Sequence, residues 1–186
     1  MDVSDGDIAI KVQNGDTEAF GELVVRYEKK ISRYMGKFLY NPEDSTDIVQ
    51  EVFMKAYINI QSFDSGQPFS PWIYRIAHNE AINFLKKRKP ASLSMFDVDV
   101  LFPHPIAKEE THSDTERELN KKLLDEVIDK LDNKYRETLL LYFYEDLSYK
   151  EISQTLRIPI SLVGVRITRG KEKLLKLAGE NIKNNI

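Results

Sequence analysis

The sequence has no cysteine among its 186 residues, which excludes disulfide bonds, thiolate metal sites and cysteine nucleophiles. Its three histidines, His78, His104 and His112, do not have the spacing of a metal-binding pair on one helix. Glycine-rich phosphate loops are absent as well. Asp47 and Glu51 have the ligand chemistry for a metal ion, but no histidine supports them. We therefore expect neither catalysis nor a bound metal or cofactor.

Signals for membranes and export are also lacking. No apolar run approaches the length of about 18 residues that a bilayer-spanning helix needs. The chain opens with Met1 to Asp5, a segment that is acidic where a secretory signal is basic. We therefore expect a cytoplasmic protein without membrane insertion.

The net charge of −3 argues by itself against nucleic-acid binding, because phosphate neutralisation needs clustered lysine and arginine residues. The charge is unevenly distributed, however: residues 1–90 sum to −1, residues 91–118 to −5 and residues 119–186 to +3. Basic residues concentrate at 86–89 and at 157–176. The distribution permits two basic surfaces separated by an acidic segment, although a basic run alone is equally typical of a solvated helix face.

Apolar residues recur at spacings of three and four along most of the chain, and no segment alternates as a strand would, so we predict an all-α protein. In the first half, signals at Asn14-Gly15-Asp16, Asn41-Pro42 and residues 62–69 separate four helices. We expect Ser70 to cap the fourth helix, with Pro71 as its first residue.

Composition then divides the chain into domains. Residues 1–90 form the first helical domain, and residues 91–115 indicate a flexible linker because they contain two prolines, scattered acids and no sustained period. Residues 116–178 form the second helical domain, and residues 179–186 form a tail. We therefore predict two small helical domains, a four-helix one and a helix-turn-helix one, joined by a flexible linker.

The strongest single motif begins at Ser148. Ser148 and Glu151 predict a capping box at the start of an eight-residue helix, and a tight joint from Leu156 to Pro159 leads into a last helix that starts at about residue 160. This is the pattern of a helix-turn-helix, whose second helix fits a DNA major groove about 12 Å wide. A plain helical hairpin with a solvated basic face fits the same residues equally well.

An aromatic-rich loop precedes the helix that ends in the first basic run. Unstacked bases of single-stranded DNA lie on aromatic faces, while lysine and arginine hold the backbone. We expect Trp72 to belong partly to the core, and Phe69 with the loop before it to face a ligand. The candidate residues for single-stranded DNA are Phe63, Phe69, Trp72, Arg75, His78, Asn79, Asn83, Lys86, Lys87 and Arg88.

A third element lies on the predicted third helix. Asp47, Gln50 and Glu51 follow one another at spacings of three and four, which places them on one acceptor-rich face. Taken alone, this is the pattern of an ordinary solvated helix face.

Together and in this order, the motifs resemble the extracytoplasmic-function group of sigma-70-type sigma factors, and the resemblance covers nearly the whole chain. The N-terminal pattern of that family is matched by Gly15-Asp16, Glu18-Ala19-Phe20, Leu23 and Tyr27. The resemblance implies an alternative sigma factor whose partners are core RNA polymerase, through its clamp helices and flap, and promoter DNA. An anti-sigma factor is a further candidate partner, because members of the family are often held by one.

The resemblance also implies a role for each motif. Asp47, Gln50, Glu51 and Phe53 match the surface that binds the clamp helices of the largest polymerase subunit, and residues 69–79 match the region that melts and reads the −10 element. The second domain matches the −35-reading domain. The candidate −35 residues are Ser161, Gly164, Val165, Arg166, Arg169, Lys171 and Lys173.

Three departures from the family pattern affect these expectations. Gly164 and Val165 stand where base-reading hydrogen-bond donors are usual, so we expect −35 binding to rely on phosphates and DNA shape. Arg157 replaces a frequent turn glycine, and we expect it to adopt a left-handed conformation at a cost of about 1 kcal/mol. Asn83 replaces a commoner aspartate, which removes a negative charge beside the DNA.

Two alternatives stay open. A helix-turn-helix regulator that acts without polymerase would share the second domain, but its first domain would need a ligand pocket, a phosphoacceptor or a dimer interface. The acidic linker either mimics nucleic acid in the RNA exit channel of the polymerase or is a solvated tether, and both readings fit its composition.

Overall fold

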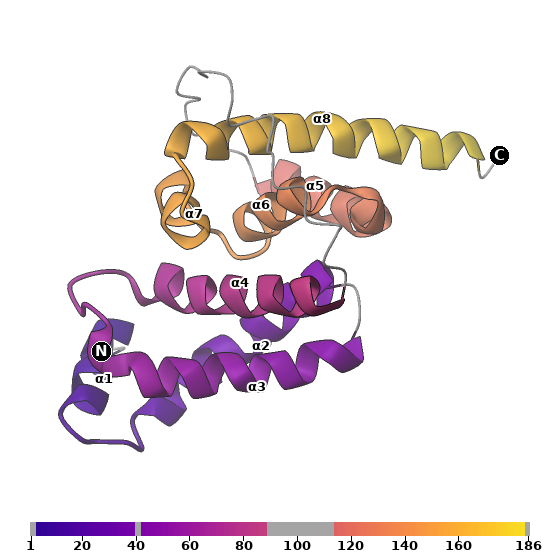
Figure 1. The fold of residues 1–186 in the computed structure, drawn as a ribbon. Coiled ribbons are helices and arrows are strands. Elements are labelled where there is room, and N and C mark those ends of the chain that lie inside the picture. The colour runs from indigo at the N-terminus through magenta and orange to yellow at the C-terminus, as the bar shows by residue number, and fades with distance from the viewer. Residues whose placement is uncertain (1–2, 40–41, 89–113, 185–186) are drawn as a thin grey trace. The chain divides into compact units, whose positions relative to one another are not determined.

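The computed structural model describes residues 3–39, 42–88 and 114–184, which belong to two compact units (Figure 1). No strand occurs in these ranges, so the all-α prediction is confirmed. The first unit contains α1 (Asp5–Gln13), α2 (Phe20–Leu39), α3 (Pro42–Asn59), the 3₁₀ helix η1 (Ile60–Ser62) and α4 (Phe69–Arg88). The second unit contains α5 (Asp114–Val127), the 3₁₀ helix η3 (Ile128–Lys130), α6 (Asn133–Phe143), α7 (Tyr149–Leu156) and α8 (Ile160–Asn184).

Some predictions fall outside the described residues. These are the Asn41 cap and almost all of the linker assigned to residues 91–115. Because α5 begins at Asp114, the last two residues assigned to the linker are helical. In the same way α8 continues to Asn184, so residues 179–184, which were assigned to the tail, are helical. The remaining domain boundaries stay predictions.

The joint between α1 and α2 forms as its sequence indicates. Gly15 has a φ of 100°, a left-handed backbone conformation that side-chain-bearing residues rarely adopt. Its backbone N–H donates to the carbonyl of Val12, and Oδ1 of Asp16 accepts a hydrogen bond of 3.2 Å from the backbone N–H of Ala19. The glycine therefore ends α1, and the aspartate caps the turn that leads into α2.

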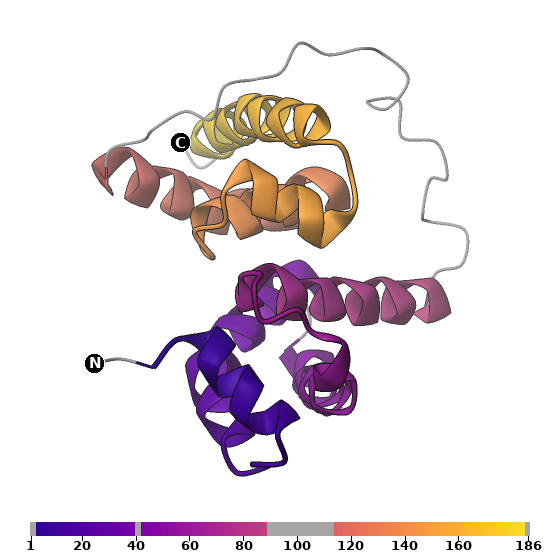
Figure 2. The ribbon, with the colours of Figure 1, turned by 90° about the vertical axis from the view of Figure 1, so that its left-hand side faces the viewer.

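The core of the first unit lies around α2, which packs against α3 and α4 (Figure 2). Tyr27, Ile31, Tyr34 and Phe38 are buried at spacings of three and four, which confirms the predicted inward face of this helix. The ring of Tyr34 meets the ring of Tyr74 on α4 edge to face, with centroids 5.6 Å apart.

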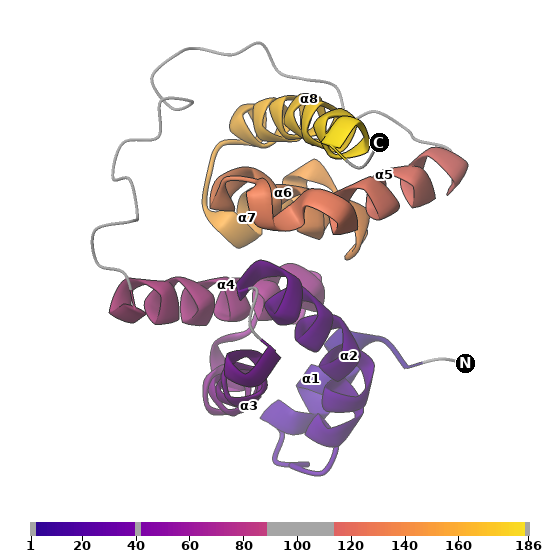
Figure 3. The ribbon, with the colours of Figure 1, turned by 90° about the vertical axis from the view of Figure 1, so that its right-hand side faces the viewer.

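In the second unit, α6 is the central helix, and Figure 3 shows it among α5, α7 and α8. All residues from Tyr135 to Phe143 are buried, as in a helix that is covered on every side. Arg136 is buried as well, because its guanidinium group donates to the backbone carbonyls of Ile128, Asp129 and Leu131 at 2.8 to 3.0 Å. These bonds attach η3 to α6.

The start of α4 differs from the prediction. The helix begins at Phe69 rather than at Pro71, so Ser70 is not its cap. The first N–H groups of a helix have no intrahelical acceptor, so Pro71, which lacks an N–H, is tolerated within the first turn as well as at its start.

Among the helices of the described ranges, none combines the length and apolar character that a membrane crossing requires. Within the same ranges, no group of three or more histidine, aspartate or glutamate side chains is placed to hold a metal ion.

Candidate nucleic-acid interface

The aromatic residues around the start of α4 form a packed cluster. Phe63 and Phe69 are only 5% and 2% exposed, and their ring centroids lie 5.2 Å apart. Phe69 also contacts the ring of Tyr27 on α2 at 5.3 Å. Phe63 and Phe69 are therefore core residues rather than exposed stacking platforms, although Phe69, which begins α4 and packs on α2, also borders the pocket beside the loop. Trp72 lies against both rings and is half-buried, which agrees with a partial core role.

The loop from Phe63 to Pro68 is shaped by Asp64. Its Oδ1 accepts a hydrogen bond of 3.0 Å from the backbone N–H of Gly66, and its carbonyl accepts one of 2.9 Å from the N–H of Gln67. An aspartate that bonds to a backbone N–H two residues later defines a tight turn. The glycine and the proline predicted a loop here, and the hydrogen bonds of Asp64 give this loop a defined conformation.

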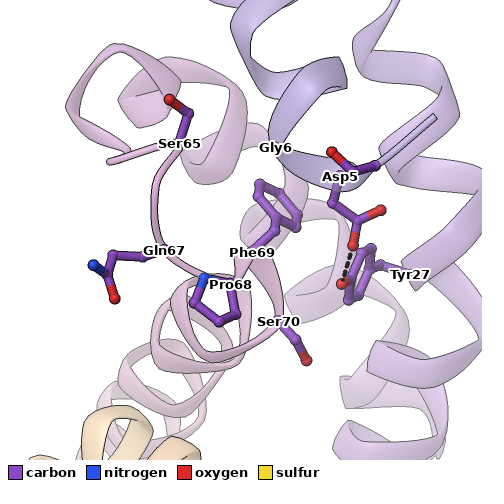
Figure 4. Close-up of a pocket in the computed structure, with 9 residues that line it drawn as sticks. Asp5, Gly6, Tyr27, Ser65, Gln67, Pro68, Phe69 and Ser70 are labelled. Carbon is purple, nitrogen blue, oxygen red and sulfur yellow. Dashed lines mark hydrogen bonds between the residues drawn. The ribbon is translucent and has the colours of Figure 1, made fainter.

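A pocket of about 310 Å³ lies between this loop and α1 (Figure 4). This volume is at the lower end of the range usual for small-molecule sites. Figure 4 shows Asp5 and Tyr27 on one side and Ser65 and Gln67 on the other. The lining residues are Ser4, Asp5, Gly6, Tyr27, Ser65, Gln67, Pro68, Phe69 and Ser70. Sequence reasoning identified the loop but missed Ser4, Asp5 and Gly6, for which the sequence holds only a weak signal, a glycine in the first turn of a short helix.

The α1 wall of the pocket carries a hydrogen-bonded carboxylate. The hydroxyl of Tyr27 donates to Oδ2 of Asp5 at 2.6 Å, and Nη1 of Arg26 lies 2.7 Å from Oδ1. Burial, followed by the hydrogen bond to Asp5, raises the pKa of Tyr27 well above its ordinary range. The tyrosine is therefore a protonated donor at neutral pH, and Asp5 presents acceptor oxygens whose charge Arg26 balances.

The exposed residues of α4 form a polar row that becomes basic toward its end. Asn79, Asn83, Lys86 and Lys87 are exposed and share one helical face by spacing, whereas Arg75 and His78 are half-buried. The acidic residue of this helix, Glu80, is paired with Lys55 of α3 at 2.7 Å. The side chain of Arg88 lies outside the described residues.

The predicted acceptor face of α3 is present, with one correction. Asp47, Gln50 and Glu51 are exposed, but Phe53 is buried, because it lies on the side of α3 that packs against the core. Its ring is therefore not available to a partner. Two apolar residues that the sequence analysis did not single out, Met54 and Ile58, are 52% and 67% exposed, and they continue the row formed by Asp47 and Glu51 at helical spacing.

The helix-turn-helix of the second unit is confirmed. Ser148 Oγ accepts from the backbone N–H of Glu151, and the carboxylate of Glu151 accepts from the N–H of Ser148 at 2.8 Å, so the capping box is complete. Arg157 has φ 54° and ψ 45°, the left-handed conformation that was predicted. Ser153 fastens the turn, because its hydroxyl donates to the carbonyl of Ile158 at 2.6 Å.

Not all candidate −35 residues of α8 are accessible. Gly164 is buried and has no side chain to extend beyond its neighbours, so it offers no side-chain contact to a base. Lys173 is exposed, but it lies over the ring of Tyr135, with its Nζ 3.4 Å from Oδ2 of Asp132, so it is directed toward α6. The other candidates, which are half-buried, are Ser161, Val165, Arg166, Arg169 and Lys171.

A fully exposed row on α8 was missed. Thr168, Glu172 and Lys176 are exposed, and helical spacing places them on one face with Val165 and Arg169. The sequence signal for this row is the apolar stripe of α8, because the row lies on the opposite face of the helix.

Comparison with known proteins decides the family. Models described as Sigma-70 region 2 and Sigma-70, region 4 match residues 23–90 and 121–174. The chain is 35% identical over 173 residues to the ECF RNA polymerase sigma factor SigW of Bacillus subtilis, covering 89% of this chain and 92% of that protein. The chain belongs to the extracytoplasmic-function group of sigma-70-type sigma factors.

Solved structures agree on the fold of this sigma factor. CnrH, in complex with the cytosolic domain of CnrY, matches with a TM-score of 0.71 at 24% identity, covering 96% of this chain and 99% of that one. The sigma factor RpoE from Bartonella quintana, in complex with the anti-sigma factor NepR, matches with a TM-score of 0.63 at 22% identity, covering 85% and 95%. At these identities the likeness concerns the fold alone.

Membership of this family settles the broad class of activity. As an alternative sigma factor, the chain directs transcription and is not an enzyme. The region 2 match accounts for most of the first unit, which a helix-turn-helix regulator acting without polymerase does not explain. This match begins at residue 23, so α1 precedes it.

Proposed function

We propose that this sigma factor binds core RNA polymerase through α3, captures a base of the opened −10 element in the pocket beside the loop from Phe63 to Pro68, and binds the −35 element through α8. The observation that carries the proposal is the pocket itself, which lies in the same unit as the polar and basic row of α4. A pocket for a base and cations for a backbone are the two requirements of single-strand binding.

The polymerase-binding surface is the exposed row of α3. Asp47 and Glu51 supply negative charge, which steers association with a basic partner and fixes its register. Met54 and Ile58 add exposed apolar area on the same side, and exposed apolar area rimmed by polar groups is typical of protein interfaces. The proposed contact with the clamp helices is therefore acidic at one end of the row and apolar at the other.

The burial of Phe63 and Phe69 alters how the −10 strand is held. The two rings are buried against one another, and Phe69 also packs on Tyr27, so an unstacked base does not lie on an exposed ring but enters the pocket that Phe69 helps to line. Asn79, Asn83, Lys86 and Lys87 then follow the strand along α4. Capture of the base stabilises the melted state without hydrolysis.

The −35 contact uses the accessible residues of α8. Arg166, Arg169 and Lys171 bind phosphates, and Val165 supplies an apolar contact for a thymine methyl group. The flap of the polymerase is proposed as a further contact of the second unit. Action in the cytoplasm follows from the proposed binding of polymerase. An anti-sigma factor is a further candidate partner, because the RpoE structure, which shares this fold, contains one.

Reconstituted transcription tests the proposal. Core polymerase supplied with the chain should give promoter-specific transcripts, and Glu51→Lys should weaken core binding by roughly tenfold or more, because it reverses a charge within the interface. Glu28→Lys makes the same change at an exposed position of α2 and should leave binding unchanged. The proposal fails if no template gives a specific transcript while the chain alone footprints duplex DNA.

A further inference from the structure

The pocket has two walls of different origin. The loop from Phe63 to Pro68 lies within the region 2 match, whereas α1, which supplies Asp5 and Gly6, precedes that match. Because residues of both segments line the pocket, contacts that fix the distance between α1 and the loop bear on the proposed base capture.

Gln13, the last residue of α1, makes the central contact. Its side-chain Nε2 donates hydrogen bonds of 2.8 Å to the carbonyls of both Ile60 and Phe63. Ile60 begins η1 and Phe63 begins the loop, so one half-buried amide holds the segment that leads into the pocket. No other side chain of α1 in the described residues is recorded to bond with this segment. In the reverse direction, Nε2 of the exposed Gln61 donates to the backbone carbonyl of Gln13 at 3.1 Å.

At its other end, α1 meets the loop through backbone alone. A Cβ added to Gly6 would lie 2.9 Å from the carbonyl oxygen of Ser65, closer than real Cβ atoms approach an oxygen. The loop is therefore tied to the end of α1 by Gln13 and lies against its start at Gly6.

We propose that Gln13 is a positioning residue for base capture: it holds the loop from Phe63 to Pro68 at the distance from α1 that keeps the pocket open to one unstacked base of the promoter strand. This rests on the proposed function of the pocket. Because the amide of Gln13 bonds to backbone carbonyls, it acts on the position of the loop and touches no DNA itself. The helix outside the family match is thus part of the −10-reading apparatus.

The test measures how strongly the captured base contributes to binding. Holoenzyme is assembled from core polymerase and the full chain, and its affinity is measured for fork DNA with a duplex upstream part and a single-stranded −10 strand. Each base of the single strand is replaced in turn by an abasic site. For the unaltered chain we expect one position where the abasic site weakens binding by roughly fivefold or more, as expected for the loss of one bound base.

Gln13→Met retains the length and volume of the side chain but removes both hydrogen bonds. We expect the abasic penalty at the sensitive position to fall below about twofold, with core binding unchanged, because an ill-positioned loop no longer distinguishes a base from its absence. Gln61→Ala is the matched control, since it removes an α1 contact that does not reach the loop, and its penalty should equal that of the unaltered chain. If Gln13→Met does not fold, as judged by core binding, Gln13→Asn keeps the amide but shortens its reach and should reduce the penalty in the same direction.

The outcomes separate the two proposals. A full abasic penalty in both Gln13 variants overturns the positioning role while leaving base capture intact. The absence of any sensitive position in the unaltered holoenzyme overturns base capture itself, and the positioning role with it. If Gln61→Ala reduces the abasic penalty as much as Gln13→Met does, the specific role of Gln13 is also overturned, because the result indicates general loosening of α1.

Discussion

The hydroxyl of Tyr27 donates a 2.6 Å hydrogen bond to the carboxylate of Asp5, which joins the middle of α2 to the first turn of α1. The other oxygen of the carboxylate is paired with Arg26 at 2.7 Å. Asp5 and Tyr27 both line the pocket, so the hydrogen bond that stabilises the first unit also fixes one wall of the pocket.

This bond makes the first unit lose stability as the pH rises in the alkaline range. The pKa of Tyr27 is raised in the folded state, so above the ordinary tyrosine pKa of about 10 the unfolded chain loses the proton that the folded chain retains. Stability from this group is fully present below pH 10 and falls by up to about 1.4 kcal/mol per pH unit above it. Tyr27→Phe should remove this part of the slope and cost about 1 kcal/mol at neutral pH.

Trp72, the single tryptophan of the chain, lies in the first unit and reports its unfolding by fluorescence. Urea titrations at pH 8 to 11 therefore measure the slope directly. Tyr57→Phe, at a residue 42% exposed, is the control and should keep the slope of the unaltered chain. Identical slopes for Tyr27→Phe and the unaltered chain would contradict the prediction.

The left-handed turn of the helix-turn-helix gives a second prediction. Arg157 adopts φ 54° although it carries a side chain, at a cost of about 1 kcal/mol. Arg157→Gly should therefore stabilise the second unit by up to about 1 kcal/mol, whereas Arg157→Ala removes the same charge without relieving the backbone. Hydrogen exchange of the α7 and α8 amides measures the difference, and equal protection in the two variants would show that the charge rather than the backbone matters.

Features encoded by a few neighbouring residues were predictable from the sequence. The glycine at position 15, the capping box of Ser148 and Glu151, and the conformation of Arg157 each depend on residues within about four positions, and all three are confirmed. The helical periodicity of α2 likewise predicted its buried face.

Features that depend on packing between distant segments were not predictable. Phe69 is buried where it meets Tyr27, 42 residues earlier, and the pocket is lined by residues as far apart in the sequence as Gly6 and Ser65. Family resemblance assigned Phe53 and Gly164 to binding surfaces, but a motif position carries no information on which side of its own helix is covered. Only the packing of α3 and α8 decides that both residues are buried.

The close approach at Gly6 gives a third prediction. An alanine here would place a Cβ 2.9 Å from the backbone oxygen of Ser65, and a backbone atom cannot yield as a flexible side chain does. Gly6→Ala should therefore displace the loop and weaken binding of holoenzyme to fork DNA by roughly fivefold, the scale of one bound base, while core binding is retained. Gly21→Ala, where a Cβ meets nothing within 4 Å, is the matched control and should leave fork binding unchanged. Unchanged fork binding in Gly6→Ala would show that the pocket tolerates movement of its loop.

A fourth prediction concerns the buried arginine of the second unit. Arg136 satisfies the carbonyls of Ile128, Asp129 and Leu131, and its removal leaves buried acceptors without donors. Arg136→Met should destabilise the second unit by about 3 kcal/mol, because each unsatisfied buried group costs about 1 to 3 kcal/mol. Hydrogen exchange of the α6 amides measures the loss, and Lys130→Met, a change at the exposed last residue of η3, is the control.

The last prediction separates phosphate binding from base reading at the −35 element. Arg169 and Val165 share a face of α8 with the exposed Thr168, whose hydroxyl and methyl groups can contact a base edge. Arg169→Ala should weaken binding nearly equally for all members of a randomised −35 library and reduce the slope of log affinity against log salt by about 0.9, the loss of one phosphate contact. Thr168→Ala should instead alter the preference at one or two positions while keeping the salt slope. A sharp preference at many positions that disappears in Val165→Ala would contradict the weak readout proposed for this helix, because a valine side chain offers no hydrogen-bond donor or acceptor with which to specify several bases.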